Sequence, residues 1–356
     1  MFLKSLQLTN FRNYSSLELS FDNRPTIFVG NNAQGKSNIL EAIYLLSTTK
    51  SQRVEDEDEL IKTGEKFLRV EGFIVDNLPA DGEMELMILI NGEKDEVNFR
   101  KKLLVNGLSK RSLDFLGNLR SVIFYPSDIN MVTGAPSLRR WHLDLMLAQI
   151  DYEYKKCLTL YEQFLTSRNR VLKRIREGEA KVDELEYWTS ELVNNGLIVA
   201  KKRKEFFEFV KQSEKSLGEY KFEYLPSEVS LEKLNQTLDR EIASAQTLIG
   251  PHRDDFRIFL SGKNMAHFGS RGEQRMATLA FKMESLEYMS KISGKRPLLL
   301  LDDVFSELDP AHRATVAAIS KKQQTIIATV ELENIPKDFL DSSRILKVED
   351  GKIIGT

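Results

Sequence analysis

The segment from Gly30 to Ser37 is the feature that most constrains what this chain can fold into. It reads GNNAQGKS and fits the phosphate-loop pattern G-x-x-x-x-G-K-[ST] in full. A run typical of a buried strand, 26–29, precedes it, and apolar residues at helical spacing follow it. The alternative is an accidental turn rich in glycine and asparagine, which would not require that context. The sequence therefore predicts a nucleotide-binding loop.

Each residue type in this loop has an expected role. The glycines let the backbone curl, so that its N–H groups and the following helix N-terminus surround a phosphate chain. Lys36 should reach the β- and γ-phosphates, and the Ser37 hydroxyl should ligate Mg²⁺. The expected nucleotide-binding residues are continuous in the sequence: Gly30, Asn31, Asn32, Ala33, Gln34, Gly35, Lys36, Ser37 and Asn38.

Length, charge and cysteine content set the class of protein. A chain of 356 residues suggests two domains, or one domain with a large insertion. The net charge of −2 argues against coating nucleic acid by bulk charge but leaves local patches open. The single cysteine, Cys157, excludes an internal disulfide and a zinc cluster and is expected to be buried in a helix. Without a transmembrane-length apolar run or a signal peptide, we expect a cytoplasmic protein.

The order of elements predicts one α/β domain, with a mixed sheet and flanking helices, that a mainly helical arm interrupts. We expect the head to comprise 1–110 and 247–356, and the arm to comprise 111–246. Two domains in tandem fit the order less well. Strands are expected at about 2–8, 15–21, 25–29, 67–75, 84–90, 256–260 and 325–330, helices at about 136–216 (broken near Gly178 and Gly196), 271–291 and 310–320, and turns at Asn91-Gly92, Asn106-Gly107 and Asp350-Gly351.

A second nucleotide signal follows Leu298–Leu301. Four leucines predict a fully buried strand, and Asp302 and Asp303 come directly after them, at the edge where α/β sheets place ligands. Asp302 is the expected Mg²⁺ partner. Asp303 is placed to orient and deprotonate a water that attacks the γ-phosphate. A strand that ends in a solvated acidic turn is the less favoured interpretation.

Two further segments carry weaker signals for anion binding. In Phe268–Arg275, a Ser and a Gly stand just before a helix and could offer a hydroxyl and free N–H groups to an anion. Because the chain already has a phosphate loop, this second loop suggests that another subunit closes over the γ-phosphate. In the turn 10–14, Arg12 could flank a nucleotide, although a plain polar turn fits equally well.

A local excess of basic residues lies between about 100 and 140. Its members are a candidate surface for the DNA phosphate backbone, and a solvated face is an equally good interpretation. They are Arg100, Lys101, Lys102, Lys110, Arg111, Arg120, Arg139 and Arg140.

These segments, taken together, resemble a known family. The phosphate loop, SRGEQR at 270–275, 298–303 and SELD at 306–309 resemble the ordered set found in ABC-type ATPase heads. Within those heads the whole chain resembles the RecF family of bacterial recombination mediators. The similar stretches are LTNFRNY at 8–14, EAIYLLS at 41–47, Arg139-Arg140 with Asp144, GPHRDD at 250–255 and DDVFSELD at 302–309.

The resemblance implies a fold and a function. It implies an ABC-type head with a helical arm that binds ATP and Mg²⁺ and dimerises with two nucleotides between the protomers. Ser270 and Gly272 of one protomer would face the γ-phosphate that Lys36 of the other holds, so Ser270 joins Lys36, Asp302 and Asp303 as a catalytic candidate. Such a dimer would be an ATP-dependent clamp on double-stranded DNA near single-strand gaps. With RecR and RecO, it would help RecA to replace the single-strand binding protein.

Three departures and two rival classes qualify that expectation. Glu273 stands where the family commonly has Gln, Asp303 where most ABC heads have Glu, and Val330-Glu331 supplies no His after its strand. The last two departures suggest slow, switch-like hydrolysis.

A metabolic P-loop ATPase or a transporter subunit is the alternative, which the long arm argues against. The head of an SMC-type structural protein would need long heptad segments, which this chain lacks.

Overall fold

The computed structural model describes residues 2–75, 82–92 and 100–354. It divides into two compact units, a head that runs up to Asp128 and resumes at Leu279, and an inserted unit, 129–278. The inserted unit begins and ends later than the predicted arm, 111–246. One reason is that strand β8 (Ser121–Phe124) pairs within the head sheet. The second boundary falls within helix α9 (Arg271–Ser293).

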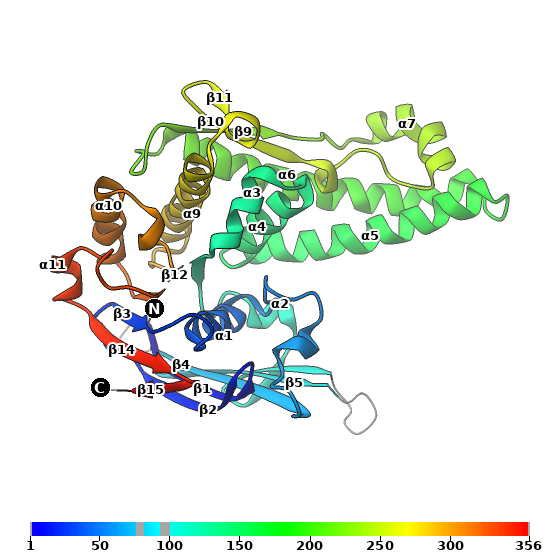
Figure 1. The fold of residues 1–356 in the computed structure, drawn as a ribbon. Coiled ribbons are helices and arrows are strands. Elements are labelled where there is room, and N and C mark those ends of the chain that lie inside the picture. Colours follow the sequence, from blue (N-terminus) through cyan, green and yellow to red (C-terminus); the bar gives the residue numbers. More distant parts are fainter. Residues whose placement is uncertain (1, 76–81, 93–99, 355–356) are drawn as a thin grey trace. The chain divides into compact units, whose positions relative to one another are not determined.

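The first sheet of the head is mostly parallel and holds the nucleotide signals (Figure 1). Its strand order is β15-β14-β3-β13-β12-β8, and only β15 is antiparallel to its neighbour. Every residue of β12 and β13 is buried, which explains the unbroken leucine run and confirms the predicted strand at 298. The bounds are β3 Thr26–Val29, β12 Leu298–Asp302, β13 Thr325–Thr329, β14 Arg344–Glu349 and β15 Lys352–Ile354.

The second sheet of the head is antiparallel, in the order β2-β1-β4-β5-β6-β7. Asn106 and Gly107 have φ of 50° and 74°, which confirms the predicted tight turn between β6 and β7. The turn predicted at Asn91-Gly92 extends beyond the described residues. Helix α1 (Lys36–Thr48) contacts strands of both sheets. The bounds are β1 Phe2–Phe11, β2 Tyr14–Ser20, β4 Phe67–Val75, β5 Met84–Asn91, β6 Lys101–Val105 and β7 Leu108–Lys110.

Helices complete the head. At the start of α10 (Pro310–Ser320), the Asp309 side chain caps the helix by accepting from the His312 N–H at 3.0 Å, and Pro310 occupies the first helical position, which confirms the helix predicted at 310–320. The turn between β14 and β15 falls at Asp350-Gly351, as predicted. Two short helices, α2 (Ser112–Phe115) and α11 (Lys337–Leu340), connect strands. Within the described ranges of the whole chain, no helix combines the length and the hydrophobicity needed to cross a membrane.

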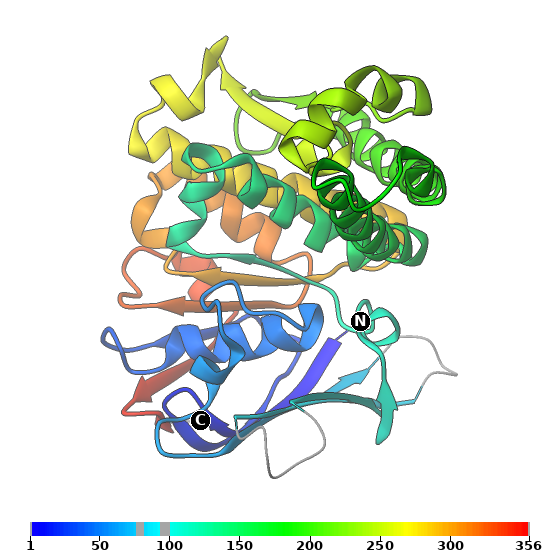
Figure 2. The same ribbon diagram turned by 90° about the vertical axis from the view of Figure 1, so that its right-hand side faces the viewer.

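The inserted unit combines long helices with a small sheet (Figure 2). Its three strands pair antiparallel in the order β11-β10-β9. Sequence periodicity did not predict β9 or α7. Cys157 is buried on α5, as expected. The bounds are α3 Asn130–Thr133, α4 Pro136–Ala148, α5 Tyr152–Arg176, α6 Glu186–Gln212, β9 Tyr220–Leu225, α7 Leu231–Ser244, β10 Asp255–Leu260, β11 Lys263–Asn264 and α8 Met265–Phe268.

Only one of the two predicted helix breaks is correct. Gly178 follows the end of α5 with φ of +76°, a conformation that favours glycine. Gly196 lies inside α6 instead. A Cβ there would come within 3.0 Å of the Tyr161 ring and 3.1 Å of Val229. The missing side chain therefore allows close packing of α5 against α6, and the helix continues.

Buried ion pairs hold the inserted unit together. The Arg203 side chain, 1% exposed, donates to Asp144 at 2.7 Å and to Asp254 at 2.8 Å. Arg168 donates to Glu241 at 2.7 Å, and both of these side chains are also fully buried. Buried charges are stable only when they are paired and hydrogen-bonded, so each arginine fixes the elements around it.

Candidate nucleotide site

Two glycines of the phosphate loop are required by close contacts with neighbouring groups. Gly35 has φ of +110°, and a Cβ there would lie 2.6 Å from the Tyr14 hydroxyl and from the Asn13 side-chain nitrogen. A Cβ on Gly30 would lie 2.3 Å from the carbonyl oxygen of Val348. A side chain would clash at either position, so the curled form of the loop requires glycine at both.

Lys36 turns back over the loop that precedes it. Its Nζ donates to the carbonyl oxygens of Gly30 and Asn31, both at 2.7 Å. Burial lowers the pKa of Lys36, and the carboxylates of Asp302 and Asp303 act in the opposite direction. Two backbone carbonyls of the loop thus hold the Lys36 ammonium, and two acids at the end of β12 act on it electrostatically.

Ser37 and Asp302 meet at the carboxyl end of β12. The Ser37 Oγ donates to Asp302 Oδ1 at 2.8 Å, although 265 residues separate them in the sequence. Burial raises the pKa of Asp302, while the Ser37 hydrogen bond and the Arg53 charge lower it by less. A hydroxyl and a buried carboxylate are hard oxygen donors of the kind that Mg²⁺ prefers, so these residues fit the predicted metal. A divalent cation and a proton would compete for the same carboxylate.

Asp303 occupies a strained position beside this pair. Its φ is +51°, a region that non-glycine residues rarely adopt, and its N–H donates to the Ala328 carbonyl at 2.8 Å. Its Oδ1 is shielded from solvent and has no hydrogen-bond partner among the described residues. Backbone strain and an unpartnered carboxylate oxygen are typical of functional positions. The structure thus places Lys36, Ser37, Asp302 and Asp303 together, as the sequence predicts.

The turn between β1 and β2 braces the phosphate loop. The Asn13 side chain donates to the Gln34 carbonyl at 3.2 Å, and the Tyr14 hydroxyl donates to the Gly35 carbonyl at 3.1 Å. Asn38, a predicted nucleotide residue, donates through its side chain to Asn13 at 2.8 Å. The turn is therefore more than a surface connection, because it fixes the loop on which the phosphate would rest.

Glu41 anchors the same region from helix α1. It is only 1% exposed, and its carboxylate accepts from Arg12 at 2.8 Å and 3.0 Å, from Ser51 at 2.6 Å and from Arg53 at 3.1 Å. Arg12 also donates to the Glu59 carbonyl. The guanidinium of Arg12 is thus committed to protein groups, and a contact with nucleotide stays a prediction. Sequence reasoning missed Glu41 and Arg53 as parts of the site, although an acid within an apolar helix was a usable signal.

The second anion loop lies in the inserted unit. Both the N–H and the Oγ of Ser270 donate to the Glu273 carboxylate at 2.8 Å, which closes the first turn of α9 as a capping box. These hydrogen bonds lower the pKa of Glu273. Gly272 has no heavy atom within 4 Å of where a Cβ would lie, so its surface is open. The predicted contact of this loop with a second protomer stays a prediction.

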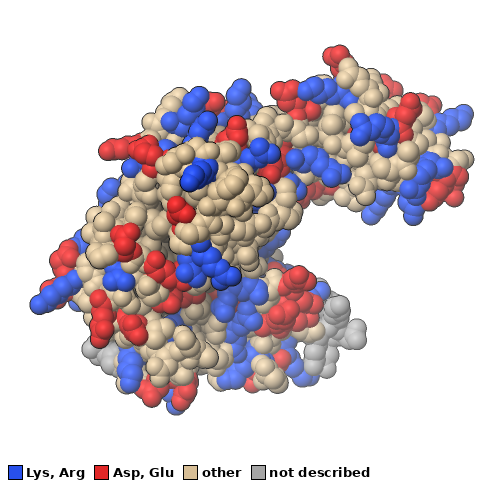
Figure 3. All heavy atoms as spheres, turned by 45° about the horizontal axis from the view of Figure 1, so that its top comes forward, with Lys and Arg blue, Asp and Glu red and all other residues tan. Residues whose placement is uncertain are grey.

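Several of the basic residues between 100 and 140 are paired with acids. Arg100 pairs with Asp56 at 2.5 Å, and Lys101 pairs with Glu57. Arg139 pairs with Asp255 at 2.6 Å within the inserted unit. Figure 3 shows Lys and Arg interspersed with Asp and Glu on the face in view. Pairing with acids reduces the net positive charge around these members, and contact of the segment with the DNA phosphate backbone stays a prediction.

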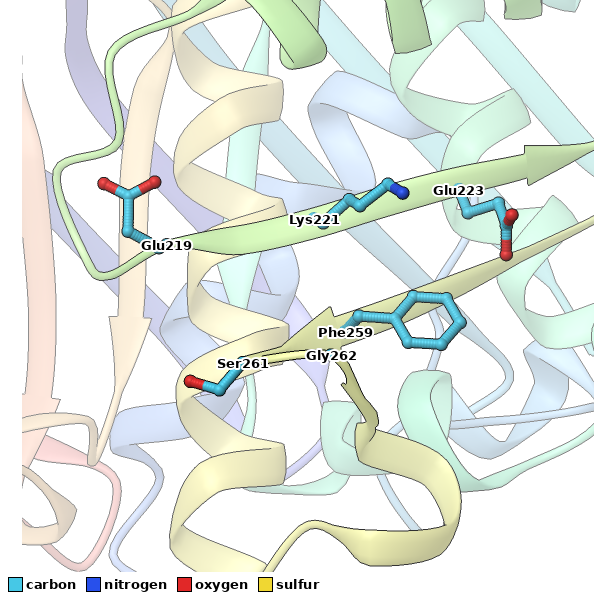
Figure 4. A pocket seen from close by; sticks show the side chains of 6 residues that line it. All are labelled: Glu219, Lys221, Glu223, Phe259, Ser261 and Gly262. Atoms are coloured by element: carbon cyan, nitrogen blue, oxygen red, sulfur yellow. The ribbon is translucent and has the colours of Figure 1, made fainter.

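A hollow of about 480 Å³ opens on the small sheet of the inserted unit (Figure 4). Lys221 and Glu223 lie on β9, Glu219 directly precedes this strand, and Phe259 stands opposite Lys221 on β10. The lining, completed by Ser261 and Gly262, includes none of the predicted nucleotide residues. Its mixed charges select no ligand class.

Comparison with known proteins decides the family. The model of the "RecF/RecN/SMC N terminal domain" matches residues 2–353. A DNA replication and repair protein RecF from Bacillus cereus (strain G9842) is 35% identical over 378 residues, which cover 99% of this chain and 98% of the relative. The chain belongs to the RecF family. A RecF from Bacillus anthracis (strain A0248) is similar to the same extent.

Solved structures agree with this assignment. The chain is similar to the recombination mediator protein RecF-ATP of the RecFOR pathway, with 32% identity, a TM-score of 0.86 and coverage of 99% of this chain and 96% of that one. An Smc head domain from Pyrococcus furiosus, at 18% identity and a TM-score of 0.54, covers 99% and 96%. The latter likeness concerns the fold alone. The fold of this RecF-family chain is thus the ABC-type ATPase head, as the sequence predicts, with an inserted unit.

Proposed function

We propose that this RecF-family chain is an ATP-dependent DNA-binding protein of recombinational repair and replication-gap processing. The observation that carries the proposal is the hydrogen bond between Ser37 and Asp302, made beside the buried Lys36. This arrangement joins the phosphate loop to the acidic end of a sheet strand, as phosphoryl-transfer sites require. The solved relative described as RecF-ATP supports ATP as the nucleotide.

The nucleotide would bind through groups that the fold already positions. Backbone N–H groups of 30–38 and the N-terminus of α1 would surround the phosphates, and Lys36 would leave its carbonyl partners for the β- and γ-phosphates. Ser37 and Asp302 would hold Mg²⁺, directly or through water. The metal would neutralise charge on the phosphates. Asp303, with its unpartnered oxygen, would orient the attacking water and accept its proton.

ATP would act by changing the oligomeric state. In the proposed dimer, Ser270 and Gly272 of one protomer contact the γ-phosphate held by Lys36 of the other, so each nucleotide carries contacts to both chains. ADP lacks the γ-phosphate and would favour the closed pair less. Only a ligand with different affinities for two states can shift their populations, and the γ-phosphate supplies that difference. Hydrolysis would then reset the clamp.

The proposed target is double-stranded DNA near single-strand gaps, and the proposed partners are RecR and RecO, with RecA loaded as the outcome. The names of the relatives, DNA replication and repair protein RecF and a mediator of the RecFOR pathway, support this assignment. Phosphate contacts would make DNA binding sensitive to salt and largely indifferent to sequence. We propose slow hydrolysis, because Asp303 is a short acid and Glu331 follows β13 where many ABC heads carry His.

The decisive experiment measures ATP affinity, protein mass and duplex-DNA binding together, with ATP, ADP or no nucleotide. Wild type should form a DNA-bound dimer with ATP alone. Lys36→Ala removes charge-assisted hydrogen bonds and should weaken ATP binding about 10- to 100-fold, so dimer and DNA complex are lost. Lys322→Ala, an exposed lysine of the head, is the control and should behave as wild type.

Two results would contradict the proposal. DNA binding that ignores the nucleotide would separate the ATPase from DNA recognition and remove the switch. Absence of DNA binding at low salt under every condition would favour a metabolic or transporter-type P-loop ATPase instead.

A further inference from the structure

Phe268 is an exposed aromatic residue beside the second anion loop. Its side chain is 71% exposed, the largest value among the large hydrophobic residues of the described chain. It ends helix α8, and its ring contacts His267 edge-on with 6.4 Å between ring centres. Leaving a phenylalanine in water forgoes the free energy that burial would supply. A single exposed apolar side chain is common on protein surfaces, but this one stands two positions before Ser270, the residue expected to face a second protomer.

The loop that carries Phe268 is tightly constrained. The Gln274 side chain donates to the Met265 carbonyl at 3.0 Å, and both residues are buried. A Cβ on Gly269 would lie 2.8 Å from that same carbonyl, so only glycine permits the turn. On the other side of the turn, the hydrogen bonds from Ser270 to Glu273 fix the start of α9. The outward position of Phe268 is thus built into the local hydrogen bonding.

Chain geometry connects Phe268 to the proposed dimer. It precedes Ser270 by two positions, and two residues of extended chain span at most about 7 Å. When Ser270 contacts a γ-phosphate on another protomer, the backbone of Phe268 lies within that distance of the Ser270 backbone and therefore near the interface. Its ring, which is largely exposed, is then available to contact the partner's surface.

We propose that Phe268 is an apolar anchor of the ATP-dependent dimer and that its partner is a second copy of this chain. The inference rests on the proposed function. The Ser270 contact is polar and orients the two protomers, whereas Phe268 supplies buried apolar area, the usual source of affinity at interface centres. Because the ring reaches the partner only when Ser270 is seated on the nucleotide, its contribution depends on ATP. In a two-fold dimer the contact occurs twice.

The test compares Phe268→Ala with Phe268→Leu and with Tyr187→Ala. Tyr187 is a matched control, because it is an aromatic residue of the inserted unit that is 61% exposed but lies on α6. Dimer dissociation constants are measured by sedimentation with a non-hydrolysable ATP analogue, together with analogue affinity of the monomer and the melting temperature. Phe268→Ala should weaken the dimer at least about tenfold, Phe268→Leu less, and Tyr187→Ala not at all. Monomer affinity and melting temperature should not change.

Each contrary outcome has a defined meaning. If wild type dimerises and Phe268→Ala dimerises equally well, the anchor is overturned and the proposed function stands. A defect in Phe268→Ala that follows from weaker analogue binding by the monomer also overturns the anchor, as does an equal loss in Tyr187→Ala. If wild type stays monomeric with the analogue while Lys36→Ala binds it less tightly, both the dimer and the anchor fall.

Discussion

Replacing Asp303 by asparagine is expected to slow ATP hydrolysis by about 10²- to 10⁴-fold, the range for loss of a general base, while ATP binding and the ATP-dependent dimer persist. Asparagine keeps the shape of the side chain and tolerates the positive φ of +51° at this position. It removes only the carboxylate, whose unpartnered Oδ1 is the expected proton acceptor. Alanine would instead combine loss of the acid with an unfavourable backbone conformation. Phosphate release in a single turnover, with protein in excess over ATP, measures the effect despite slow hydrolysis.

Asp350→Asn is the matched control for this change. Asp350 has a similar φ of +47° in the turn between β14 and β15, and its backbone N–H donates to the Gln34 side chain. The substitution keeps that N–H, so the same chemical change tests the backbone conformation without the acid at position 303 being altered. It should hydrolyse ATP like wild type. If Asp303→Asn also keeps the wild-type rate, Asp303 is not the proton acceptor. If Asp303→Asn loses the dimer together with hydrolysis, the residue supports nucleotide binding and does not act on the water.

The head could be predicted from the sequence because its signals are local. The phosphate loop, the strand at 298–302 and the capped helix at 310 each depend on residues that are neighbours in the chain. Their meeting in space follows from a general rule, since parallel strands present their carboxyl ends at one edge. The pairing of Ser37 with Asp302 across 265 residues was therefore predictable from two short segments.

What escaped prediction depends on contacts between distant segments. Glu41 is a buried acid because Arg12 and Arg53, from separate loops, meet it. Gly196 continues a helix because a tyrosine of another helix packs against it. The acidic partners of the basic segment at 100–140 were not predicted, because acids such as Asp56 and Asp255 are distant in the sequence from the members they pair with. A single sequence does not show which charges meet, so a count of basic residues overstates the free positive surface.

Arg203→Leu is expected to destabilise the inserted unit by about 3–5 kcal/mol, the range found when one partner of a buried ion pair is removed. The change leaves the side chain of Asp254, 2% exposed, without its cation. Tyr224 and the Ser227 N–H still donate to that carboxylate, but neither carries a charge. Urea unfolding followed by tryptophan fluorescence reports this unit selectively, since the only two tryptophans of the sequence, at 141 and 188, both lie within 129–278.

Lys204→Leu is the matched control. It makes a similar change at the next, exposed position of α6 and should alter the free energy of unfolding by less than about 0.5 kcal/mol.

Adding Asp254→Asn to Arg203→Leu removes the unpaired buried charge, so the double variant should be more stable than Arg203→Leu alone. If Arg203→Leu unfolds at the wild-type urea concentration, the pair contributes no net stability. If the double variant is the less stable one, the hydrogen bonds of Asp254 matter more than its charge. Analogue binding at the phosphate loop should survive in both variants, because Lys36, Ser37 and Asp302 belong to the other compact unit.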